Sequence, residues 1–145
     1  MIIKCILFLL SFGVYLQTLS PTISTGDSGE FCACSVILGI AHSPGYPLYC
    51  LIGKIFTFVV PFGNLAFRIN LLSAVFAALA ILLLYSLLEL LLSADFSLQS
   101  DGKLRSVVCT KISAAFGTLL FAFAKCFWKA AVQAEVFTLN AFFAV

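Results

Sequence analysis

The chain has 145 residues, of which 63% are hydrophobic and only 10% are charged, and its formal net charge is +2. Soluble globular domains are about 45–50% apolar. With a mean hydropathy of +1.17, this chain has too few polar side chains to cover a surface in water. The composition excludes a soluble enzyme domain, and the small, scattered positive charge excludes a nucleic-acid-binding protein. We therefore expect an all-α integral membrane protein.

Four apolar stretches are predicted to enter or cross a membrane, which takes about 20 residues of helix. Residues 2–19 form the first span, for which a signal peptide is the alternative because Lys4 precedes a short apolar run. Residues 69–92 are the clearest span, and 107–124 form the third. The fourth, 136–145, stops inside an apolar run, so we expect the chain to be incomplete.

Two hydrophilic segments separate these spans within what we treat as a single membrane domain, 1–145. With a cytoplasmic amino terminus, 20–68 is an external loop and 93–106 is a cytoplasmic loop. The positive-inside rule does not decide this orientation, because four basic residues fall on each side. Within the external loop, 48–60 is apolar but too short to span, which predicts an interfacial or re-entrant helix.

The external loop contains the most polar stretch of the chain. Asp27 and Glu30 lie three residues apart at the start of a predicted short helix, 28–40, in the pattern of a capping box. Capping alone explains both carboxylates, and catalysis is the alternative, since a cap also holds a carboxylate in place. The only histidine, His42, follows in a turn where Pro44 prevents the helix from continuing.

The six cysteines are predicted to be small apolar side chains. None forms a CxxC pair, and with a single histidine in the chain a zinc site is not expected. A disulfide from Cys50 to Cys32 or Cys34 is the alternative on an oxidising face of the membrane.

Seven short motifs stand out in chain order: TLSPT (18–22), DSGEF (27–31), LGIAHSPGYPLY (38–49), PFGN (61–64), RINLLSA (68–74), FW (127–128) and AEV (134–136). Together they resemble the polytopic membrane family, once catalogued as a domain of unknown function, that includes the endoplasmic-reticulum protein O-mannosyltransferase transmembrane protein 260. The resemblance runs from about Leu16 to the end of the chain. Ser43 departs from the family's usual His-Pro-Pro-Gly, and family members have many more spans and an additional carboxy-terminal part.

The resemblance implies the amino-terminal part of a type C glycosyltransferase-like helical bundle. Such enzymes transfer a sugar, with mannose as the candidate here, from a polyprenyl-phosphate carrier to a protein or other hydroxyl acceptor on the non-cytoplasmic face. Their essential acidic residue in the first external loop maps onto Asp27 or Glu30, with Asp27 the first choice. The expected substrate-binding residues are His42, Arg68, Glu135 and Lys129.

The chemistry of these side chains agrees with that expectation. A positioned carboxylate base accelerates attack by a hydroxyl typically ~10²–10⁴-fold. Arg68, Lys129 and Lys54 are candidate cations for the phosphate leaving group. His42 either contacts phosphate or acceptor or, in the simpler interpretation, is a hydrogen-bonding structural residue of its turn.

Glu135 has two interpretations that the sequence leaves open. It either faces Asp27 across the site, holding the acceptor or sharing a divalent metal, or it pairs with Lys129 or Lys125 at the end of a helix. No motif is specific enough to name an ion.

Three function classes remain from the sequence: the glycosyltransferase, a non-catalytic membrane scaffold or truncated remnant of one, and a piece of a transporter. The last rests only on polar residues near membrane depth. The expected location is a bacterial inner membrane or the endoplasmic reticulum, as a multi-pass protein. The expected partners are membrane lipid, the lipid-linked sugar and the acceptor, with no nucleic acid.

Overall fold

The computed structural model describes residues 2–97 and 103–145, with the side chains of all of these except 95–97 and 103–106. Over these ranges the chain forms seven helices and no strands, which confirms the all-α class. The helices are α1 (Ile2–Gln17), α2 (Ser28–Ile37), α3 (Pro47–Val59), α4 (Leu65–Ser97), α5 (Lys103–Ala122), α6 (Lys125–Ala131) and α7 (Phe137–Ala144).

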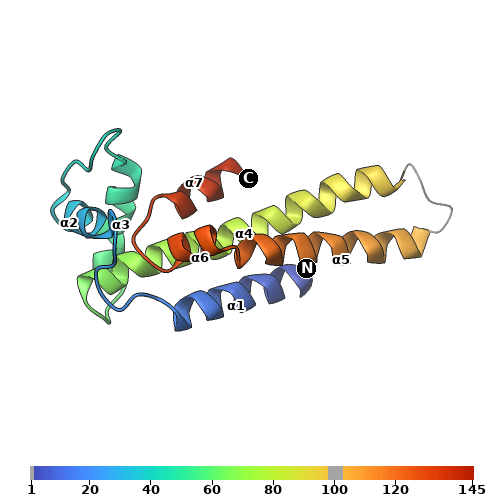
Figure 1. Cartoon of the computed structure of the whole chain (residues 1–145), viewed down its shortest axis with the longest axis horizontal. Helices are drawn as coiled ribbons and strands as arrows, with labels where there is room; N and C mark the ends of the chain where they lie inside the picture. Colours follow the sequence, from blue (N-terminus) through green and yellow to red (C-terminus); the bar gives the residue numbers. More distant parts are fainter. Residues whose placement is uncertain (1, 98–102) are drawn as a thin grey trace.

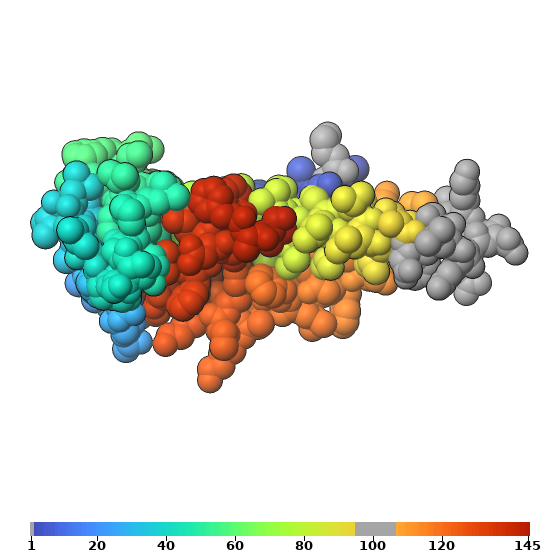
Figure 2. All heavy atoms as spheres, turned by 90° about the horizontal axis from the view of Figure 1, so that it is seen from above, coloured from blue at the N-terminus to red at the C-terminus, as the bar shows by residue number. Residues whose placement is uncertain are grey.

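The long helix α4 organises the molecule. Its 33 residues extend roughly 50 Å at 1.5 Å per residue. In Figure 1, α5 runs antiparallel beside α4, α1 lies along the middle of α4, and α2 and α3 gather at the end where α4 begins. The space-filling view in Figure 2 shows α6 and α7 lying against α4, next to the α2–α3 region. The hydrophilic segment that contains α2 and α3 therefore lies at the end of the apolar bundle where α4 begins.

Within residues 2–97 and 103–145, one helix is long and apolar enough to cross a membrane, namely α4 over Leu65–Ala94. A second candidate among the described residues is the pair Val107–Ala122 and Lys125–Ala131, which is bent by 67°. The helices in the predicted spans 2–19 and 136–145 have 16 and 8 residues, fewer than the roughly 20 that a crossing takes. The multi-pass arrangement therefore stays a prediction.

Helical structure enters both ends of the predicted cytoplasmic loop, 93–106, whose side of the membrane stays a prediction. Helix α4 continues to Ser97, and α5 already begins at Lys103, because no glycine or proline interrupts either stretch. Residues 98–102, between the two helices, lie outside the described residues.

The start of α4 has a local cause. Asn64 Oδ1 accepts a hydrogen bond from the Phe67 amide at 2.8 Å, as an N-cap residue does. Gly63, directly before it, has φ 73°, a conformation in which a Cβ would lie 2.5 Å from the ring of Phe67. The turn that leads into α4 therefore requires this glycine.

Helices α2 and α3 form a tightly packed pair. A Cβ on Gly53 of α3 would lie 2.5 Å from Ser35 Oγ of α2, so the two helices approach more closely than a side chain would allow. Phe31 of α2 packs its ring 5.5 Å from that of Tyr46 and 5.2 Å from that of Tyr49. These contacts hold the intervening loop, which contains the predicted turn with His42, against α2.

The buried residue Asn70 of α4 holds distant segments of the chain together. Asn70 Nδ2 donates to the carbonyls of Ser20 and Thr22 at 2.8 and 3.0 Å. The Ser20 amide in turn donates to the Val132 carbonyl at 2.9 Å. The segment before α2 and the connection between α6 and α7 therefore meet beside α4.

Candidate functional site

Neither carboxylate at the start of α2 makes the predicted capping interaction. Asp27 occupies the N-cap position, but its side chain makes no cap hydrogen bond and its backbone, at φ −81° and ψ 0°, is not extended as a cap residue usually is. Glu30 binds His42 rather than turning back to the Asp27 amide. The capping box is therefore wrong, and the start of the helix does not account for either carboxylate.

Glu30 and His42 form a two-point contact. Glu30 Oε1 accepts a hydrogen bond from the His42 amide at 2.6 Å, and Oε2 lies 2.9 Å from His42 Nδ1. The imidazole also packs against Phe31 and Tyr46, with ring centroids 5.7 and 5.5 Å away. Glu30 thus fixes both the backbone and the ring of His42, and it leaves Nε2 of that ring for another partner.

Asp27 lies at that free nitrogen. Its Oδ2 is 4.0 Å from His42 Nε2, beyond hydrogen-bond distance, and 59% of its side chain is exposed. Both oxygens of Glu30 are occupied, whereas no hydrogen bond to the Asp27 carboxylate is found among the described residues. Of the two predicted catalytic carboxylates, Asp27 is the one available to an incoming molecule.

Glu135 reaches the same place from the other end of the chain. Its Oε1 lies 3.9 Å from the position a Cβ would take on Gly26, the residue before Asp27. Its backbone is held by Ser73 Oγ of α4, which accepts from the Glu135 amide and donates to its carbonyl, each at 3.2 Å. The structure therefore brings Glu135 beside Asp27, and its side chain bonds to Gln133 rather than to a lysine.

Three carboxylates consequently face a single imidazole. Hydrogen bonds from His42 lower the pKa of Glu30, and the hydrogen bond with Glu30 raises the pKa of His42, with smaller contributions from the charges of Asp27 and Glu135. Burial raises the pKa of Glu135, and the charge of Asp27 adds to that effect. The hydrogen bond from Gln133 and the charges of Lys129 and His42 act in the opposite direction.

The same side chains could offer ligands to a metal ion. Asp27, Glu30 and His42 each have a ligand atom within 4.8 Å of the others. However, the Glu30 oxygens and His42 Nδ1 already bind one another, so a cation would have to break that contact. The observed arrangement is an imidazole held between carboxylates, and we assign no ion to it.

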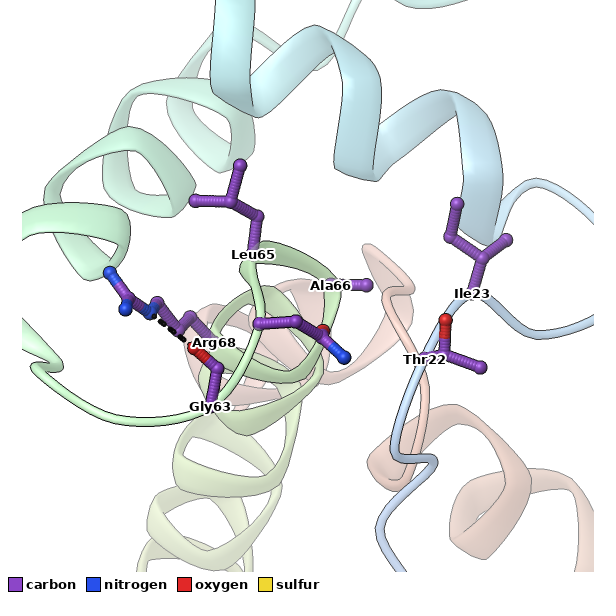
Figure 3. Close-up of a pocket in the computed structure, with 7 residues that line it drawn as sticks. Thr22, Ile23, Gly63, Leu65, Ala66 and Arg68 are labelled. Carbon is purple, nitrogen blue, oxygen red and sulfur yellow. Dashed lines mark hydrogen bonds between the residues drawn. The ribbon is translucent and has the colours of Figure 1, made fainter.

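Arg68, a predicted phosphate ligand, is occupied by backbone carbonyls. Its Nη1 donates to Thr57 at 2.6 Å, and its Nε lies 3.3 and 3.2 Å from the carbonyl oxygens of Phe62 and Gly63. Figure 3 shows this contact at the edge of an open groove of about 590 Å³. The groove is lined by Thr22, Ile23, Gly63, Asn64, Leu65, Ala66 and Arg68. The guanidinium therefore holds the α3–α4 turn, and a role toward phosphate stays a prediction.

The two predicted lysines differ in their surroundings. Lys54 donates to the Val36 carbonyl near the end of α2 and lies over the Phe58 ring, 5.2 Å from its centroid. Lys129 is exposed in the last turn of α6, and its charge lowers the pKa of Glu135. Lys129 is thus the lysine whose charge acts on the carboxylate cluster.

Cys32, Cys34 and Cys50 are free and buried. Burial raises the pKa of Cys32 and Cys50. This agrees with their interpretation as apolar side chains.

Sequence reasoning missed the polar residues that support the site. Ser73 holds the Glu135 backbone, and Gln133 bonds to the Glu135 carboxylate at 3.1 Å. Ser24 Oγ donates to Gln133 Oε1 at 2.9 Å across 109 residues of sequence. The one signal available was that a glutamine precedes Glu135 by two residues in a chain with few polar side chains.

Comparison with known proteins gives the family. A family model described as the protein O-mannosyl-transferase TMEM260 N-terminal domain matches residues 27–145. The chain is similar to protein O-mannosyl-transferase TMEM260 of Mus musculus, with 34% identity over 131 residues, which cover 90% of this chain and 16% of the relative. It is also similar to protein O-mannosyl-transferase tmem260 of Dictyostelium discoideum, with 30% identity over 97% of this chain and 16% of the relative.

The chain thus spans about 16% of the length of these curated relatives. No solved structure matches it. The match of the family model to most of the chain confirms the resemblance seen in its motifs: the chain belongs to the family of the TMEM260 N-terminal domain.

Proposed function

We propose that this chain forms the amino-terminal part of a multi-pass membrane glycosyltransferase and that its first external loop supplies the carboxylates of the active site. The enzyme transfers a sugar such as mannose from a polyprenyl-phosphate carrier to a hydroxyl of a protein acceptor on the non-cytoplasmic face. The observation that carries this proposal is the free carboxylate of Asp27 beside an imidazole that Glu30 holds in place. Its relatives, which are named protein O-mannosyl-transferases, support the same reaction.

Each group in the cluster has a distinct role in the proposed reaction. Asp27 accepts the proton of the acceptor hydroxyl as the hydroxyl oxygen bonds to the anomeric carbon of the sugar. The bond from that carbon to the carrier phosphate breaks, and the phosphate leaves with the electron pair. His42 and Lys129 are the cations next to the carboxylates, and they stabilise the charge that develops on the phosphate.

The placement of the cluster supports a site at the membrane surface. If α4 crosses the bilayer, α2 and α3 lie at the end where it begins (Figure 1). Leu51, Ile55 and Phe58 of α3 are 53%, 55% and 76% exposed and recur at three- and four-residue spacing. An exposed apolar stripe of this kind is typical of a helix that lies in the interface. A lipid-linked donor would reach the cluster along this surface.

Asp27→Asn tests the proposal in the natural protein within its own membrane. The change keeps the size of the side chain but removes the base, so sugar transfer should fall by about 10²–10⁴-fold while membrane insertion is unchanged. Glu89→Gln, which alters a carboxylate in another part of the molecule, is the matched control and should retain transfer. Full transfer by Asp27→Asn would instead favour a non-catalytic scaffold.

A further inference from the structure

Gln133 links two parts of the site through one buried amide. It is 4% exposed and lies in the connection between α6 and α7. Its Nε2 donates to Glu135 Oε1 at 3.1 Å, and its Oε1 accepts from Ser24 Oγ at 2.9 Å. An ionised carboxylate only accepts hydrogen bonds, so the contact with Glu135 is enough to place the NH₂ group of Gln133 toward Glu135 and its oxygen toward Ser24.

The backbone of Glu135 does not depend on this amide. Ser73, which is fully buried in α4, binds both the amide and the carbonyl of Glu135 and also lies 3.0 Å from the Tyr49 hydroxyl. Gln133 therefore controls where the carboxylate points, while Ser73 controls where the backbone lies.

The Glu135 carboxylate is directed toward the cluster around Asp27. Its Oε1 lies against Gly26, 3.9 Å from an added Cβ. The charged groups that face it are Asp27 before α2, His42 after α2 and Lys129 of α6. Helix α3 contributes the neutral hydroxyl of Tyr49, and α4 contributes Ser73.

We propose that Gln133 is a positioning residue, whose amide holds the Glu135 carboxylate where it binds the acceptor hydroxyl next to Asp27. The role of Glu135 toward the acceptor rests on the function proposed above. The control of the carboxylate by Gln133 does not, because the contact exists without substrate.

The first experiment measures Glu135 without using activity. In the natural protein, labelling of Glu135 by a water-soluble carbodiimide is followed by mass spectrometry as a function of pH. Gln133→Leu removes a hydrogen bond that favours the ionised carboxylate, so the midpoint of labelling should move to higher pH by about one unit, a tenfold change in proton affinity. An unchanged midpoint would overturn the proposal.

Two further variants separate this effect from general damage to the fold. Gln133→Asn keeps a neutral amide but is one methylene shorter, so it should shift the midpoint in the same direction as Gln133→Leu. Ser24→Ala removes only the contact on the far side of the amide and should label like the wild type. A shift in Ser24→Ala as large as that in Gln133→Leu would indicate a loosened fold and would contradict the positioning role.

The second experiment measures transfer by the same variants. Gln133→Leu should raise the KM for the acceptor at every pH, because the carboxylate loses its direction, and should raise it most at the acidic end, where Glu135 is also protonated. The KM for the lipid-linked donor should be unchanged. An unchanged KM for the acceptor would contradict the proposal. The two proposals can fail separately. If Gln133→Leu shifts the labelling midpoint but the wild-type protein transfers no sugar, the control of Glu135 by Gln133 stands and the proposed function is refuted.

Discussion

Two charged regions of this molecule are built in opposite ways. Between α1 and α4, Lys4 Nζ lies 3.6 Å from Glu89 Oε2, and the two charges match one to one. At the other region, three carboxylates lie around the single imidazole of His42, and among the described residues Lys129 is the one lysine whose charge acts on them. Both regions use ordinary ionisable side chains, but only the first balances them.

The difference in charge balance distinguishes residues that stabilise the apolar bundle from residues that form a functional site. An ionisable group beside apolar helices is usually paired, because an unpaired charge there is costly. The Lys4–Glu89 pair meets that requirement and has no further role to explain. An excess of carboxylates around His42 gives the fold no such benefit, and perturbed, unbalanced groups of this kind are typical of functional sites.

The largest effect expected from the comparison comes from breaking the Glu30–His42 contact. Glu30→Ala removes both of its hydrogen bonds, so His42 loses its position next to Asp27, and transfer should fall about 10²-fold, as for other displaced catalytic groups. The measurement is kcat/KM for sugar transfer in native membranes. Glu30→Gln keeps an acceptor for the His42 amide and should lose less; equal rates for wild type and Glu30→Ala would remove Glu30 from the site.

A smaller effect should appear in the pH dependence of stability. The folded pKa of His42 is raised above its ordinary value of 6.5, so the stabilisation is complete below about pH 6.5 and is lost as the pH rises through the folded value. The pKa of Glu30 is lowered from 4.5, so its part is lost only as the pH falls below that value. The advantage in unfolding temperature of wild type over His42→Gln should therefore be greatest between about pH 4.5 and 6.5. A difference that is constant with pH would contradict the ion pair.

The smallest effect is expected from the balanced region. Replacing both charged residues, by Lys4→Met together with Glu89→Leu, should leave the rate of sugar transfer within about twofold of wild type. The double-mutant cycle should give a favourable coupling energy, because each single substitution leaves the other charge without its partner beside apolar helices. Loss of transfer in the double variant would break the contrast between the two regions.

The parts of the fold that follow local rules could be predicted from the sequence. Composition gives the all-α class, and the turn that contains His42 ends α2, at Ile37 rather than at residue 40. Apolar length identifies α3 as Pro47–Val59, close to the predicted 48–60. The motifs identify the family, and the grouping of Asp27, Glu30 and His42 follows from their closeness in one loop.

The parts that depend on distant contacts could not be predicted. The capping box failed because Glu30 has a better partner 12 residues away in a loop that folds back over α2. The sequence predicts Arg68 as a cation available to phosphate, but its guanidinium donates hydrogen bonds to backbone carbonyls near the end of α3 and in the α3–α4 turn. Gln133 has no spacing rule that could relate it to Ser24, because only the packing of α6 and α7 against α4 brings them together.

The link between Ser24 and Gln133 also sets an order of events during biosynthesis. The residues lie 109 positions apart, and Trp128 Nε1 bonds to Thr18 Oγ1 across 110 positions. At roughly 5–20 residues per second, a ribosome takes on the order of 5–20 s to make the second partner after the first. During that interval Asp27 has no Glu135 beside it, so the nascent chain carries an unfinished site until Gln133 and Glu135 have been synthesised.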